Sequence, residues 1–149
     1  MHKDLPDAEH LATVSSLIAG LGIAMLFFRI QRELQMHTQG KPIWIPWADW
    51  LLVGATVLCL GMVLLPIVSG VLQPIARIRV AASAASAGVV LVIGYVFSIL
   101  AHYRLILSFG RTGLRDNPEP SEAALVAISA FAAIGVAAWV FRSLREPAT

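Results

Sequence analysis

The chain has 149 residues, of which 58% are hydrophobic and 13% are charged, and its formal net charge is +2. A soluble domain is typically about 45–50% apolar and about 25% charged, so this chain has too little polar surface to face water on all sides. Its basic residues are dispersed along the sequence, which counts against a nucleic-acid partner. The composition therefore predicts a protein that lies in a lipid bilayer.

The acidic residues, nine in all, lie outside four long apolar stretches. Charged side chains near the bilayer centre are costly, and those that remain there usually mark ion or proton pathways. We predict membrane spans over about residues 11–30, 48–70, 81–104 and 122–142, each close to the ~20 residues that cross a bilayer. The sequence thus indicates an all-α, polytopic four-transmembrane-helix bundle, one membrane domain over 1–149, and it counts against a carboxylate relay within the membrane.

The first helix is predicted to be longer than the membrane is thick. Asp7 is a favoured N-cap residue, and the apolar run Leu11–Phe28 follows it. Good helix formers continue to Gln39, where Gly40 and Pro42 end the helix. Such a helix is about 50 Å long, against ~30 Å of hydrocarbon. We expect its last turns to extend beyond the bilayer, and its acidic start is unlike the basic start of a signal peptide.

The second span is introduced by three tryptophans, Trp44, Trp47 and Trp50. Indole rings favour the headgroup region, so we expect these residues to be interfacial anchors. Pro66 follows near the far end of this span, where it either kinks the helix or terminates it.

The third and fourth spans are rich in small residues spaced four apart. Ala84 and Gly88 form one such pair, and Ala133 and Ala137 form another. Lipid provides little hydrophobic drive between helices, so close backbone approach must hold them together. We predict that these spans pack against each other through these residues. The alternative is that the same faces bind a second copy or another membrane subunit.

Four spans place both termini on one side of the membrane, which we expect to be a bacterial plasma membrane. The first span has Arg29, Arg32 and Lys41 after it and Lys3 before it. Under the positive-inside rule, this span alone places both termini outside.

The best candidate site is a polar cluster on the side of the first and third loops, formed by Glu33, His37, Asp49, His102 and Arg104. Such side chains at an interface can bind a metal, a phosphate headgroup or a partner. The alternative is that they are interfacial anchors and ordinary loop charges. No His-x-x-x-His or Cys/His spacing supports a metal, so we predict no metal site.

Haem is a narrower possibility for this side, because a bundle can hold haem between two histidines on facing helices. His102 is the only histidine well within a span. His10 is expected at the opposite face, and His37 reaches His102 only if the extension of the first helix folds back. We therefore predict no cofactor, with haem as the alternative to test.

The sequence has no Ser/His/Asp set, phosphate loop or dinucleotide fingerprint, so we predict that the protein is not an enzyme. The leading hypothesis is a non-catalytic structural or accessory subunit of a homo-oligomer or a larger membrane complex. The second is an oligomeric channel or transporter that has no intramembrane carboxylates. The third is a haem- or quinone-associated redox subunit that uses His102.

Overall fold

The computed structural model describes residues 7–40, 45–71, 75–103 and 120–144, and every regular element within these ranges is a helix. The elements in chain order are α1 (Ala8–Thr38), α2 (Asp49–Cys59), the π-helix η1 (Leu60–Leu64), α3 (Leu65–Val68), α4 (Ile75–His102) and α5 (Pro120–Ser143). Four stretches are long and apolar enough to cross a membrane: α1, α2 to α3 as one unit, Ala76–His102 and α5. The predicted all-α bundle of four transmembrane helices is confirmed.

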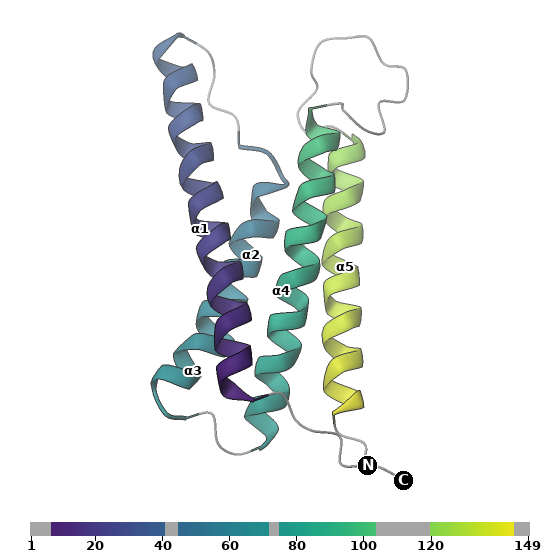
Figure 1. The fold of residues 1–149 in the computed structure, drawn as a ribbon. Coiled ribbons are helices and arrows are strands. Elements are labelled where there is room, and N and C mark those ends of the chain that lie inside the picture. The colour runs from purple at the N-terminus through teal and green to yellow at the C-terminus, as the bar shows by residue number, and fades with distance from the viewer. Residues whose placement is uncertain (1–6, 41–44, 72–74, 104–119, 145–149) are drawn as a thin grey trace.

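Helix α1 begins and ends where the sequence predicts. The Asp7 side chain caps it by accepting a hydrogen bond from the His10 N–H at 2.8 Å. At the other end Gly40 has a φ of +76°, a conformation that glycine adopts without steric cost. The 31 residues of α1 correspond to about 46 Å of helix. The last turns of α1 extend past the start of α2 (Figure 1), so α1 is longer than the span beside it, and its extension beyond the bilayer stays a prediction.

The second span continues past Pro66 to Val68 and does not end there. In the π-helix before it, the Leu65 N–H bonds to the Leu60 carbonyl. Proline has no N–H, and its ring would meet the carbonyl four residues earlier in a regular α-helix. The wider π-turn relieves that conflict, and such turns are a known cause of bends. The helix continues to Val68, and Gly70 follows with a φ of +65°.

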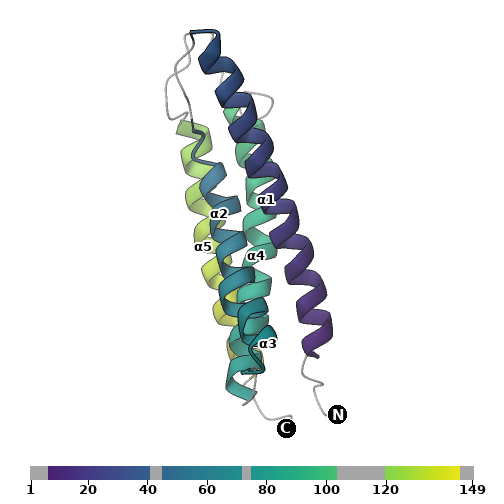
Figure 2. The same cartoon turned by 90° about the vertical axis from the view of Figure 1, so that its left-hand side faces the viewer.

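Helix α4 lies at the centre of the bundle. Consecutive spans run in opposite directions (Figure 1), and α4 packs against α1, α2 and α5. Helices α1 and α5 lie on opposite sides, with α2 and α4 between them (Figure 2). The core contains mainly Leu52, Ala55 and Cys59 from α2, with Leu91 and Tyr95 from α4. Because α4 has neighbours on several sides, it needs small residues around most of its circumference.

This central position explains how the predicted small residues are distributed. Helices α4 and α5 do pack closely, with Ala133 buried between them and Ala137 half-buried. Gly88, however, faces α2: a Cβ atom there would lie 2.9 Å from the Cys59 sulfur. Ala84 lies in a second apolar cluster that includes Val63 of η1. Gly94 of α4 lies close against Ser129 of α5, and the spacing of small residues does not predict this contact.

We expect Gly94→Ala to destabilise the bundle. The new Cβ would overlap the Cβ and Oγ of Ser129, and a serine Cβ cannot move without its backbone. Overpacking of this kind costs about 1–3 kcal/mol. The measurement is the free energy of unfolding in mixed detergent micelles.

Gly135→Ala on α5 is the matched control, since a Cβ there meets nothing within 4 Å. It should be neutral or slightly stabilising, because alanine is the better helix former. Equal effects of the two substitutions would show that Gly94 is not a packing site.

Candidate functional site

The buried side chains of Arg29, Asp49, His102 and Glu122 gather at one end of the bundle. Helices α2 and α5 begin there, α4 ends there, and α1 passes by on its way to Thr38 (Figure 1). We call this group the end cluster; its members are Arg29, Glu33, Asp49, His102, Tyr103 and Glu122. Every one of the four spans contributes to it. Each helix therefore reaches the cluster close to where it enters or leaves its apolar stretch.

Glu122, in the first turn of α5, is fully buried, with 0% of its surface exposed. Its Oε1 accepts a hydrogen bond from the Ala48 N–H at 2.9 Å, and its Oε2 lies 2.7 Å from His102 Nδ1. The Ala48 amide is one of the free N–H groups at the start of α2, where the helix dipole favours a negative charge. One carboxylate thus joins α5 to both α2 and α4.

Arg29 forms the other half of the end cluster. Its Nε lies 3.5 Å from Asp49 Oδ2, and its Nη2 lies 3.8 Å from Glu33 on the same helix. Its Nη1 donates a hydrogen bond to the Tyr103 hydroxyl at 2.7 Å. The guanidinium therefore joins α1 to α2 and to the end of α4.

Arg32 also contacts Tyr103. That guanidinium donates to the same hydroxyl, and its central carbon lies 5.1 Å from the centre of the tyrosine ring. A cation over an aromatic face adds an attraction of about 0.5–1 kcal/mol at an exposed site. This pair holds the outer turn of α1 against the end of α4.

The charged side chains of the end cluster are buried, and pairing with one another compensates for their removal from water. An isolated buried charge is very costly, and a buried pair is tolerated when its hydrogen bonds are made. Arg29 compensates Asp49, and His102 and the Ala48 amide satisfy Glu122. One atom is left over: Asp49 Oδ1 is buried and has no hydrogen-bond partner among the residues that the structure describes. Such a group costs about 1–3 kcal/mol until something donates to it.

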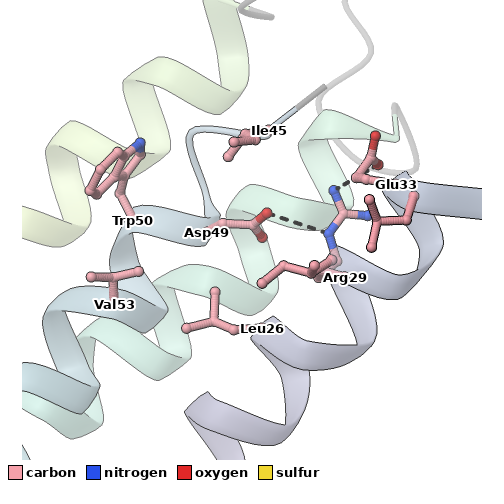
Figure 3. Close-up of a pocket in the computed structure, with 9 residues that line it drawn as sticks. Leu26, Arg29, Glu33, Ile45, Asp49, Trp50 and Val53 are labelled. Atoms are coloured by element: carbon pink, nitrogen blue, oxygen red, sulfur yellow. Dashed lines mark hydrogen bonds and ion pairs between the residues drawn. The ribbon is translucent and has the colours of Figure 1, made fainter. Parts of the chain in front are cut away.

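A groove runs over the Arg29–Asp49 pair on the outer side of α1 and α2 (Figure 3). Its volume is about 310 Å³. Its surface is almost entirely apolar, and the Arg29–Asp49 pair lies buried beneath it. The lining residues are Leu26, Arg29, Ile30, Glu33, Leu34, Ile45, Asp49, Trp50 and Val53.

The structure brings together some of the residues singled out in the sequence and separates others. Glu33, Asp49 and His102 all belong to the end cluster. His37 is exposed near the end of α1, and Arg104 lies outside the described residues. Asp49 and His102 are buried, so the alternative that they are ordinary loop charges does not fit them. Of the predicted anchors, Trp47 and Trp50 are exposed at this end, and Trp44 lies outside the described ranges.

Sequence reasoning missed Arg29 and Glu122 as site residues. Both lie just beyond an apolar stretch, and the sequence does not show that such flanking charges turn into the bundle. The long apolar stretches contain no acid, yet Asp49 and Glu122 lie in the first turns of two spans and are buried inside the protein. The position of Glu122 at the start of a span was the available signal.

The described histidines do not face one another. His10 lies at the start of α1, at the opposite end of the bundle from His102, and His37 is exposed. His102 Nδ1 is already engaged by Glu122. Within the described ranges, no group of three or more His, Cys, Asp or Glu side chains is placed to hold a metal ion. These positions do not supply the facing pair that haem ligation between helices requires.

Comparison with known proteins adds no identification. The chain matches no protein-family model, and no curated protein or solved structure is detectably similar to it. What the fold defines is the class: an integral membrane bundle of four helices with a buried polar cluster at one end.

We expect Glu122→Ala to destabilise the protein by about 3–5 kcal/mol, the usual cost of removing one partner of a buried pair. The substitution removes the acceptor of the Ala48 N–H and the carboxylate that lies beside His102 Nδ1. The measurement is again the free energy of unfolding in mixed micelles.

Glu122→Gln is the matched variant, because its amide oxygen can still accept one of the two hydrogen bonds. It should cost clearly less than the alanine substitution. A change below about 0.5 kcal/mol for both variants, the range of an ordinary surface substitution, would contradict the role assigned to Glu122.

Proposed function

We propose that the protein is a non-catalytic integral membrane protein, a structural or accessory subunit of a homo-oligomer or a larger membrane complex. The observation that carries this proposal is a second groove, formed by α2, α4 and α5 and about 480 Å³ in volume. Alanines form much of its lining, namely Ala84, Ala87, Ala130, Ala133 and Ala137. Small residues let a further helix approach closely, which is the main source of helix association in lipid.

The position of α5 supports the same proposal. This helix packs mainly against one neighbour, α4, and has few contacts with α2. Bulky side chains such as Phe131, Ile134 and Trp139 are exposed along it. A helix that is held from one side leaves its other sides free for lipid or for another membrane helix.

The end cluster supports a structural rather than a catalytic role. Its ion pairs and hydrogen bonds join helices of this chain to one another. Groups that are engaged in this way hold a fold in place, and a reacting group needs a substrate within hydrogen-bond reach.

The channel or transporter alternative stays a prediction. The groove that an oligomer would enclose is lined mostly by apolar side chains, with Ser83 as its one hydroxyl among the lining residues. Such an apolar lining suits packing against a helix better than the passage of ions.

For the cellular location, we propose a bacterial plasma membrane with both termini outside, on the balance of basic residues around the first span.

We expect Ala130→Leu to weaken assembly. Ala130 lines the second groove and is half-buried, so a leucine there fills the space that a partner helix would occupy. The measurement is the mass of the protein complex in mild detergent and in lipid nanodiscs, by native mass spectrometry. Wild-type protein should form a complex, and Ala130→Leu should shift it toward the monomer.

Ala132→Leu is the matched control, because Ala132 lies nearby on the same helix and is exposed outside the groove. It should leave the mass distribution unchanged. A wild-type protein that is monomeric in nanodiscs and recovers no partner from native membranes would contradict the proposal.

A further inference from the structure

The end cluster contains more acidic than basic side chains. Asp49 and Glu122 are buried carboxylates, and Arg29 is the buried cation beside Asp49. At the edge of the cluster, Arg32 and Glu33 carry opposite charges and cancel in the count. Among the residues that the structure describes there, these five side chains sum to one net negative charge. Such a buried charge is costly unless a positive charge compensates it.

A proton on His102 supplies the missing positive charge. Its Nδ1 lies 2.7 Å from Glu122 Oε2, and the two side chains are 4% and 0% exposed. Tyr95 and Tyr103 also face the cluster from the same part of the chain, but phenols are uncharged near neutral pH. Histidine is the side chain whose charge ordinarily changes between about pH 5 and 8. An imidazolium at this position makes the described cluster neutral.

The hydrogen bonds of Glu122 place this proton on the histidine rather than on the carboxyl group. The Ala48 N–H donates to Oε1 at 2.9 Å, at the start of α2, where the helix dipole favours an anion. Hydrogen bonds donated to a carboxylate favour its charged form. A charged Glu122 offers only acceptors, so His102 Nδ1 carries a hydrogen and donates it to Oε2.

We propose that His102 is an imidazolium in the folded protein, and that the end cluster is a proton-sensitive joint that holds the start of α5. Loss of the proton leaves a net negative charge buried beside Glu122, the residue that connects the first turn of α5 to α2 and α4. Raising the pH removes the proton, so the joint weakens as the pH rises. The inference concerns one end of the bundle and does not depend on the proposed assembly through the second groove.

The first test measures the charge of His102 directly. The chain has four histidines, so replacing His2, His10 and His37 with asparagine leaves His102 as the only one that ¹⁵N-labelled histidine reports. The full-length protein is placed in phosphatidylcholine nanodiscs, and the ring nitrogens are observed by NMR at about pH 7.5, where an ordinary histidine is mostly neutral. We expect the imidazolium signal, and its replacement by the signal of a neutral ring when the pH is raised further.

Asp49→Asn and Glu122→Gln test the charge count. Each removes one carboxylate, so that Arg29 and the remaining carboxylate balance each other without a proton on the ring. Both variants should lose the imidazolium signal at about pH 7.5. Asp49 pairs with Arg29, so Asp49→Asn would leave the signal unchanged if His102 responded to Glu122 alone. Glu9→Gln, an exposed position at the start of α1, is the control and should keep the signal.

The second test measures the opening of α5 by amide hydrogen exchange. One proton released on opening changes the equilibrium constant about tenfold per pH unit. Above the pH at which His102 becomes neutral, protection of the first turns of α5 should therefore fall about tenfold per pH unit, after correction for the intrinsic exchange rate. Protection of the last turns should stay constant.

A neutral His102 in the otherwise unaltered cluster at about pH 7.5 would overturn the proposal. So would an imidazolium signal that survives in Asp49→Asn, or equal protection of the first turns of α5 on both sides of the transition. If a variant does not fold, the pH series on the chain with an intact cluster decides the outcome, because it needs no change in the cluster.

Discussion

The constraint on which this structure depends is the burial of charge where the helices meet. Glu122 is removed from water completely, so its two oxygens must find donors inside the protein. It finds them on two other helices, at Ala48 and His102. Arg29 on α1 and Asp49 on α2 are also buried, and they form an ion pair with each other. The lipid-facing helices lack a strong hydrophobic drive to associate, so these paired charges give the bundle its fixed end.

The rest of the fold follows from α4 at the centre. Its glycines and alanines admit neighbours closely, as at Gly88 beside Cys59 and at Gly94 beside Ser129. Helices α1 and α5 then lie apart, on opposite sides of the α2–α4 pair. This leaves two open grooves of different chemistry. One lies over the buried Arg29–Asp49 pair beside α1, and the other is lined largely by alanines and lies beside α5.

The sequence predicts the elements better than their contacts. Hydropathy, the Asp7 cap and Gly40 locate the helices, because these signals are local. Side-chain partners are not local: Glu122 and Ala48 are far apart in the chain and meet only because α2 and α5 begin at one end. The face toward which Gly88 turns depends on which helix lies beside α4, and residue spacing does not specify that. Asp49 and His102 were identified as site residues, whereas Arg29 and Glu122 were missed because charges at the ends of spans are ordinarily anchors.

A double-mutant cycle between the two halves of the end cluster tests the central claim most directly. Unfolding free energies of Asp49→Asn, Glu122→Gln and the double variant would be measured in the same micelles. If the cluster acts as one unit, the two effects are non-additive, with a coupling of about 0.5–3 kcal/mol. Additivity within about 0.3 kcal/mol would show that the Arg29–Asp49 and His102–Glu122 pairs are independent, and would contradict the account.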